Sequence, residues 1–199
     1  MAKKLSEMTL EELWALFPIR LTEHRACWAD WYAEEERLLR RALPPDAVVR
    51  LAHVGSTAVK TIWAKPIVDI LLEIPAAYRM DSLEPALVSC GYRLMNRSGS
   101  RASYNKGYTE NGFAEKVFHL HLRYRGDHDE LYFRDYLTAH PDAAKAYEAL
   151  KLSLWEKYEH DRDGYTNAKA AMVSKYTERA KWEYGNRYEG EGKSENGRD

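Results

Sequence analysis

Apolar residues in the first 45 positions recur at helical spacing. Thr9 and Glu12 form a capping box, and the apolar positions that follow repeat every three to four residues up to Pro18, which predicts a short helix. A second apolar stripe covers residues 25–43, with glutamates and arginines off the stripe. It predicts a longer helix that ends before the Pro44-Pro45 pair.

The pattern changes to that of strands after Asp46. Residues 47–54 (AVVRLAHV) are rich in β-branched side chains and stop at Gly55, which indicates a strand that meets a turn. Residues 67–74 (IVDILLEI) are almost continuously apolar, as is typical of a central strand covered on both faces. The connection over 57–64 is compatible with a short helix.

The middle of the chain mixes both patterns. A helix is predicted over 81–90, followed by a third strand over 92–96. Residues 97–112 are rich in Ser, Asn and Gly and indicate a loop or hairpin. Residues 116–124 (KVFHLHLRY) alternate as a strand does.

From Glu130 onward strand signals vanish, and the last third of the chain is predicted to be helical. Three helical segments cover 129–140, 141–158 and 166–184, whereas 186–199 lack apolar residues apart from Tyr188 and are predicted to be a disordered tail. We therefore expect an α/β (α+β) fold with a mixed sheet flanked by helices. Residues 1–185 are expected to form a single domain whose helical part begins at about 130.

Composition narrows the function classes. Apolar residues make up 45% of the 199 residues, so a folded protein is expected. The 30 Lys and Arg nearly balance the 31 Asp and Glu, so no global attraction to polyanions is expected and nucleic acid is unsupported as a partner. Cys27 and Cys90 lack CxxC spacing and are predicted to be free thiols. Acidic residues interrupt any secretion signal, and no apolar run approaches a membrane span, so a cytoplasmic protein without membrane partners is expected.

The candidate chemistry centres on a Gly55-Ser56 turn between a strand and a helix. Free backbone N–H groups, a hydroxyl and a helix dipole favour a phosphate there. Residues 57–68 separate Ser56 from Asp69, so a short return would set that carboxylate beside the turn. An anion cradle facing a carboxylate is what nucleotidyl transfer needs, with a carboxylate-bound divalent metal to neutralise charge. An ordinary turn next to a capping Asp gives the same pattern.

The segment HVGSTAVKTIWAKPIVDILLEI closely resembles the signature of the GrpB family, H-[IV]-G-S-T-[AS]-V-P-G-L-x-A-K-P-I-[IV]-D. Further matches are Gly91-Tyr92, the HLHL strand at 119–122 and FRDYLTAHPDAAKAYEALK at 133–151, and the resemblance covers roughly 18–180. The family is placed in the nucleotidyltransferase superfamily. The resemblance thus implies a nucleotidyltransferase-like sheet, a nucleotide or phosphorylated small molecule as partner, and transfer of a nucleotidyl group to an unknown acceptor.

The turn and the resemblance together assign the site. Asp69 is the predicted catalytic residue, and the predicted nucleotide- or phosphate-binding residues are Gly55, Ser56, Thr57, Lys65, Arg101 and Lys106. Further cations lie at family-like positions: Arg134, Lys151, Arg162 and Lys169. As a group they would line a pocket for an acidic substrate, whereas each one taken singly is expected to be a solvated surface residue.

The sequence departs from the superfamily pattern D-x-[DE] at the metal site. Leu71 stands two residues after Asp69, and the next acid on that face, Glu73, is roughly 6.6 Å further along the strand. Mg or Mn is the expected metal. His119 and His121 share a strand face and would join Asp69 around one metal, a set that also suits a transition metal. Packing under helices and a backbone hydrogen bond are the alternative roles of the two histidines.

Three functions follow from these observations. The first is metal-dependent nucleotidyl transfer, with His53 also near the site. The second is a binding protein that holds a nucleotide or small anion without turnover, because the second metal-binding acid is lost at Leu71. The third is a metal-dependent hydrolase or metal sensor built on Asp69, His119 and His121. Some family members are joined to a dephospho-coenzyme A kinase domain, which implies a link to coenzyme A metabolism.

Overall fold

A five-stranded mixed sheet forms the centre of the protein, which was analysed as a computed structural model that describes residues 3–189. The strand order is β1-β2-β5-β4-β3, with β2 and β5 parallel and the other neighbours antiparallel. The strands are β1 (Arg50–Val54), β2 (Val68–Ile74), β3 (Arg93–Ser98), β4 (Arg101–Thr109) and β5 (Gly112–Tyr124).

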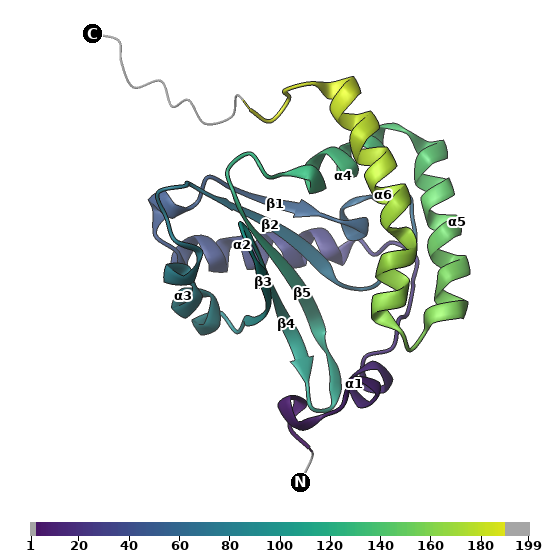
Figure 1. Cartoon of the computed structure of the whole chain (residues 1–199), viewed down its shortest axis with the longest axis horizontal. Coiled ribbons are helices and arrows are strands. Elements are labelled where there is room, and N and C mark those ends of the chain that lie inside the picture. Colours follow the sequence, from purple (N-terminus) through teal and green to yellow (C-terminus); the bar gives the residue numbers. More distant parts are fainter. Residues whose placement is uncertain (1–2, 190–199) are drawn as a thin grey trace.

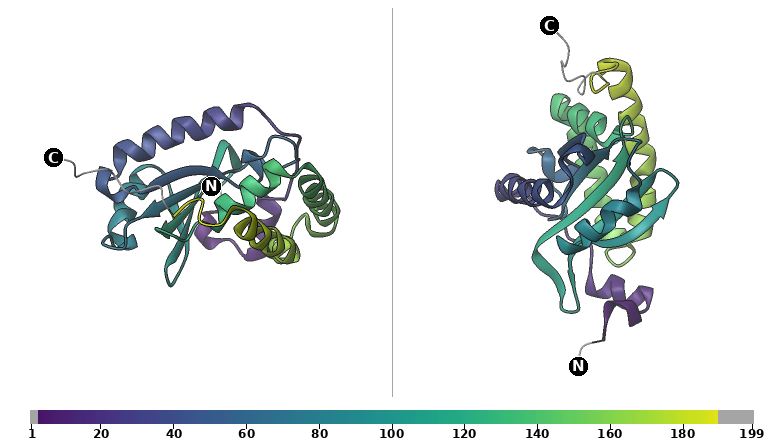
Figure 2. Two further views of the ribbon diagram at one scale, coloured as in Figure 1. Left: turned by 90° about the horizontal axis from the view of Figure 1, so that it is seen from above. Right: turned by 90° about the vertical axis from the view of Figure 1, so that its left-hand side faces the viewer.

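Helices cover both faces of this sheet, as Figures 1 and 2 show. They are α1 (Leu10–Leu16), α2 (Cys27–Ala42), α3 (Glu84–Ser89), α4 (Asp129–Ala139), α5 (Pro141–Tyr158) and α6 (Arg162–Tyr184). In the left view of Figure 2, α2 runs along one face, while α4, α5 and α6 pack together on the other. The mixed α/β class and the helical C-terminal part are confirmed.

Several local predictions changed in detail. The capping box of α1 forms, since the Glu12 backbone N–H donates to Thr9 Oγ1 at 3.2 Å. The first strand begins only at Arg50, because 45–47 form a 3-10 turn. The predicted loop or hairpin over 97–112 contains all of β4 and its turn into β5. The helix predicted over 57–64 is limited to a 3-10 turn, Ser56–Ala58.

Strand alternation separates an apolar face from a polar face. Ile70, Leu72, Leu120 and Leu122 point toward α2 and α3 and belong to the larger core cluster, around Trp28. The side chains that alternate with them face the C-terminal helices; on β2 and β5 these include Asp69, Glu73, His119, His121 and Arg123. The fold therefore collects the ionisable side chains of the central strands under α4 to α6.

The chain ends were also tested in part. Tyr188 is 9% exposed and packs on the rings of Tyr132 and His128, whereas 190–199 of the predicted disordered tail lie outside the described residues. Cys27 and Cys90 are free thiols, as predicted. Within 3–189, every helix is too short or too polar to cross a membrane.

Candidate functional site

Gly55 brings the turn after β1 directly against Asp69. In the antiparallel β1–β2 pair Val54 lies opposite Asp69, so the next residue passes beside the carboxylate. Gly55 has φ +71° and ψ −170°, and a Cβ there would lie 2.4 Å from Asp69 Oδ2. Only glycine permits both this backbone conformation and this approach. The predicted pairing of the Gly55-Ser56 turn with Asp69 is thus present, although the three-residue turn supplies no helix dipole.

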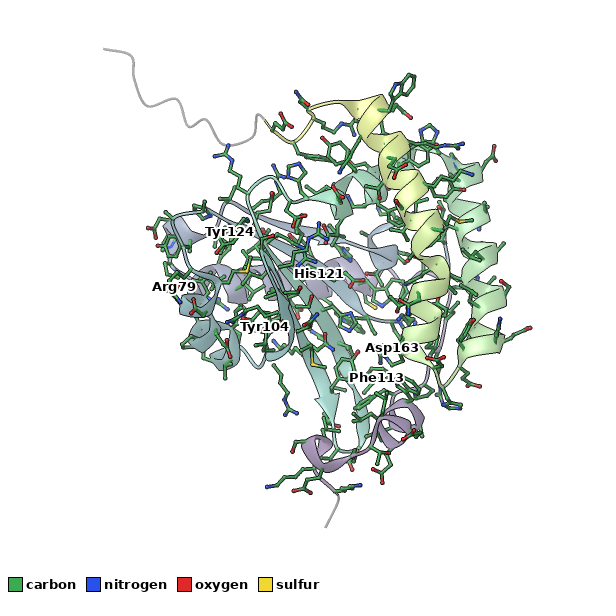
Figure 3. The ribbon with its side chains drawn as sticks, in the orientation of Figure 1. Arg79, Tyr104, Phe113, His121, Tyr124 and Asp163 are labelled. Carbon is green, nitrogen blue, oxygen red and sulfur yellow. The ribbon has the colours of Figure 1, made fainter. Side chains whose placement is uncertain are left out.

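Two histidines hold the other carboxylate oxygen of Asp69. His121 Nε2 lies 3.0 Å and His119 Nδ1 3.5 Å from Asp69 Oδ1. Burial acts to raise the pKa of Asp69, but the hydrogen bonds from both imidazoles outweigh it and hold this pKa well below its usual range. Asp69 is therefore an anion with one oxygen committed to the histidines and the other facing Gly55. Figure 3 shows His121 near the centre of the sheet.

The protonation of His119 is set by a chain of hydrogen bonds from α6. Arg162 Nη2 donates to the hydroxyl oxygen of Tyr108 at 2.8 Å, so the Tyr108 proton is free to donate to His119 Nε2, also at 2.8 Å. His119 then carries its own proton on Nδ1, toward Asp69. Burial lowers the pKa of His119, which favours this neutral form.

His121 is oriented in the same way by a second arginine. Arg123 Nη2, which can only donate, lies 3.5 Å from His121 Nδ1 and 3.1 Å from Glu130 Oε1. His121 Nε2 therefore donates to Asp69 Oδ1, and His119 Nδ1 contacts the same carboxylate oxygen.

The acids needed for a two-metal site are missing or engaged. Leu71 is fully buried and packs in the second apolar cluster, with Val54 and Ile62. Glu73 is 1% exposed, and its oxygens are bound by Arg50 Nη1 at 2.7 Å and by His128 Nδ1 and the Gly126 N–H, both at 2.9 Å. Neither residue is available as a metal ligand.

The predicted metal set of Asp69, His119 and His121 does not fit a divalent metal in this arrangement. The lone pairs of both imidazoles point toward Tyr108 and Arg123, away from Asp69. Among residues 3–189, no group of three or more His, Cys, Asp or Glu side chains is placed to hold a metal ion. Neither alternative role predicted for the histidines is observed, since both contact the carboxylate.

Four cations surround the Gly55-Ser56 turn and Asp69. Lys65 precedes β2, Lys151 lies on α5, and Arg162 and Lys169 lie on α6; this set is called the cation cluster below. Within the described residues, none of these four side chains forms an ion pair, because no carboxylate oxygen lies within 4.0 Å of their charged nitrogen atoms. Burial and the neighbouring cations lower the pKa of Lys65, and burial lowers that of Lys169.

Lys151 connects the cation cluster to Ser56. It is 2% exposed, and its Nζ donates to Ser56 Oγ at 3.1 Å and to the Trp63 carbonyl oxygen. Burial, and secondly the charge of Lys169, lower the pKa of Lys151 to about 7. A phosphate near Ser56 would restore the charged form.

Tyr165 forms the centre of the cluster. The ammonium groups of Lys65 and Lys169 lie 5.1 Å and 5.0 Å from the centroid of its ring. Tyr165 is fully buried, and its hydroxyl has no hydrogen-bond partner within the described residues. A buried hydroxyl without a partner is costly, so an acceptor of its proton is expected beside these cations.

Of the other predicted binding residues, Thr57 lies in the turn, whereas Arg101 and Lys106 lie away from it. Both carboxylate oxygens of Asp127 accept from Arg101, at 2.6 Å each. Lys106 lies on the opposite sheet face, where Nζ donates to both carboxylate oxygens of Glu35 at 2.8 Å. Thr57 Oγ1 donates to the Ile67 carbonyl oxygen.

His53, which the sequence placed near the site, contacts its turn, since His53 Nε2 lies 2.9 Å from Thr57 Oγ1. His53 stacks on Tyr32 of α2 at 5.1 Å, and burial lowers its pKa to about 4. Arg134 Nη1 donates to the His53 carbonyl oxygen at 3.0 Å.

The sequence signal for the cluster is a repeated spacing. Tyr147 and Lys151 on α5, and Tyr165 and Lys169 on α6, are each four residues apart, which puts each pair on one helix face. Tyr108, which no sequence pattern singled out, completes the site from β4.

Comparisons with known proteins show the family of the chain. The sequence model described as GrpB protein matches residues 18–179. The chain belongs to the GrpB family. The crystal structure of GrpB from Enterococcus faecalis covers 83% of this chain and 99% of that one, with 26% identity and a TM-score of 0.72.

Curated relatives extend the family comparison. The glutamate-rich protein GrpB of Alkalihalophilus pseudofirmus is 33% identical over 77% of this chain and 90% of its own length. YqkA of Bacillus subtilis is 28% identical over 92% of this chain, and this chain spans only 54% of the length of that relative. A dephospho-CoA kinase of Mycolicibacterium paratuberculosis is 26% identical over 70% of this chain and 41% of its own length. Cid1 poly(U) polymerase, at 12% identity and a TM-score of 0.48, is a fold neighbour that carries no argument about activity.

Restoring the missing acid is expected to destabilise the protein without creating a metal site. Leu71→Asp would place a carboxylate in the apolar cluster, so we expect the free energy of unfolding to fall by about 3 kcal/mol or more. The control, Leu71→Met, should cost less than about 1.5 kcal/mol. Urea unfolding with and without Mg²⁺ or Mn²⁺ checks both; a metal-dependent gain in Leu71→Asp stability would contradict the expectation.

Proposed function

We propose that this chain binds a nucleotide or another phosphorylated small molecule, with a phosphate seated between Gly55-Ser56 and the cation cluster. The observation that carries the proposal is the convergence of four cations without carboxylate partners around one half-buried turn. The buried Tyr165 hydroxyl and the backbone N–H groups of the turn add donors of the kind that phosphate oxygens accept.

Charge balance supports an anionic ligand. The cation cluster holds up to four positive charges, and Asp69 supplies one negative charge that two histidines already stabilise. Buried like charges repel one another strongly in a medium of low dielectric constant. Burial first, and the neighbouring cations second, lower the pKa values of the three lysines. A bound phosphate would offset the repulsion between these cations.

Nucleotidyl transfer to an acceptor hydroxyl is the second candidate. It is supported by the placement of Asp69 Oδ2 against the Gly55 turn, where an oriented carboxylate would meet the acceptor's proton. The lowered pKa makes Asp69 a weak base, and the acids do not fit a two-metal site, so binding is the better supported function. The similarity to a dephospho-CoA kinase makes dephospho-coenzyme A a sensible acceptor to test.

Calorimetric titration with inorganic phosphate, AMP, ADP and ATP in EDTA tests the binding function. We expect Lys169→Met to weaken nucleotide binding roughly tenfold or more, because it removes one unpaired cation. The matched control is Lys175→Met, an exposed lysine on the same helix, which should bind as the wild type does.

Two outcomes would contradict the proposal: no nucleotide binding by the wild type, or equal losses in Lys169→Met and Lys175→Met. Pyrophosphate release with ATP and Mg²⁺ tests the second candidate, which requires turnover that Asp69→Asn abolishes.

A further inference from the structure

A pocket of about 410 Å³ adjoins the cation cluster and shares two of its members, Lys65 and Arg162. The pocket lies between the chain that follows α1, the start of α2, the loop before β2 and the turn from β4 to β5. A ligand seated by its phosphate at Ser56 therefore has room to extend past Lys65 and Arg162 into this space.

The pocket contains a second pair of cations. Arg20 and Arg25 come from the segment between α1 and α2 and line the pocket. Within the described residues, neither arginine nor the pocket's one acid, Glu115, takes part in an ion pair. The pocket therefore carries a net positive charge, and its two arginines are exposed to solvent where the members of the cation cluster are buried or half-buried.

Aromatic side chains also line the pocket. Trp31 is half-buried, and Phe113 is 37% exposed. The Arg162 guanidinium lies 5.8 Å from the Phe113 ring centroid. Figure 3 shows Phe113 close to Asp163, at the end of α6 above α1. Such walls suit a planar ring and leave the cations to bind charged groups.

We infer that the ligand carries two separate anionic groups: a phosphate held at Ser56 by the cation cluster, and a second phosphate held by Arg20 and Arg25, with a nucleoside against Trp31 and Phe113. The chemical class is a nucleoside 3′,5′-bisphosphate. This inference rests on the proposed function, because the first phosphate occupies the proposed site. A longer 5′-phosphate chain would supply the same charge from one position, so the test must separate the two sources.

Adenosine 3′,5′-bisphosphate and ADP are isomers with two phosphates each, and their comparison isolates the position of the second phosphate. In calorimetric titrations of the full chain, we expect the bisphosphate to bind roughly tenfold tighter than ADP or ATP. The double variant Arg20→Gln, Arg25→Gln should lose this preference while its affinity for ADP changes by less than about twofold.

The matched control is Arg41→Gln, which removes an exposed arginine of α2 outside the pocket and should keep the preference. Equal or tighter binding of ADP or ATP by the wild type would overturn the inference, as would a preference that survives the double variant. If both isomers bind equally and Lys169→Met weakens both, the proposed function stands and the inference fails. If neither isomer binds, both fail.

Discussion

Gly55→Ala is expected to lower the free energy of unfolding by about 3 kcal/mol and to abolish phosphate binding. The new Cβ would lie 2.4 Å from Asp69 Oδ2, and the φ of +71° with ψ near 180° is a conformation that only glycine adopts at low cost. To relieve the contact, the turn must move away from Asp69, which also displaces Ser56 from Lys151. Urea unfolding and calorimetric titration with ADP measure the two effects.

Gly99→Ala is the control for a glycine with positive φ that has no close neighbour. Gly99 also has a positive φ, +55°, but nothing lies within 4 Å of the Cβ that alanine would add. We expect a cost of about 1 kcal/mol and unchanged nucleotide binding. If both variants lose the same stability and both still bind ADP, the close approach at Asp69 has no functional role.

Lys151→Met is expected to reduce nucleotide binding by roughly tenfold to a hundredfold while the protein stays folded. The methionine fills a similar volume, and it removes the buried ammonium whose pKa burial lowers to about 7. The measurement is calorimetric titration with ADP alongside a thermal unfolding curve. Lys157→Met, on the exposed side of the same helix, is the control and should bind normally.

The pH dependence of binding gives the same residue a distinct signature. A bound phosphate raises the pKa of Lys151 above about 7, so the complex holds a proton that the free protein loses as the pH rises. Affinity should therefore fall between pH 7 and 9, where the second ionisation of phosphate is already complete. Lys151→Met should flatten this profile. A wild-type affinity that is constant over the same range would contradict the assignment.

The sequence was a reliable guide where one local pattern decides the structure. The capping box at Thr9, the apolar segment 67–74 and the helices after 130 all formed, because each depends on neighbouring residues. The connection 57–64 did not form the short helix that its sequence allows. Thr57 donates to the Ile67 carbonyl oxygen before β2, and the Trp63 N–H donates to Glu148 on α5. Its backbone follows those contacts and not its helical propensity.

The candidate site, too, could be predicted from the sequence only where residues close in the chain form it. Gly55, Ser56 and Asp69 meet because β1 and β2 are adjacent in sequence. Lys106 was misplaced because 97–112 gave no strand register, and a single residue decides the sheet face. The orientation of His119 depends, through Tyr108, on Arg162, which lies more than forty positions further along the chain.

The residues around the proposed phosphate come from two parts of the fold, so a bound ligand would connect these parts. The sheet supplies the turn and Asp69, whereas Lys151, Arg162 and Lys169 come from α5 and α6. An anion bound among them would act as a clamp between the sheet and the C-terminal helices. At a hundred times its dissociation constant such a ligand adds about 2.7 kcal/mol to stability. The stability of the contact between the sheet and the helices α5 and α6 would then depend on the concentration of the ligand in the cell.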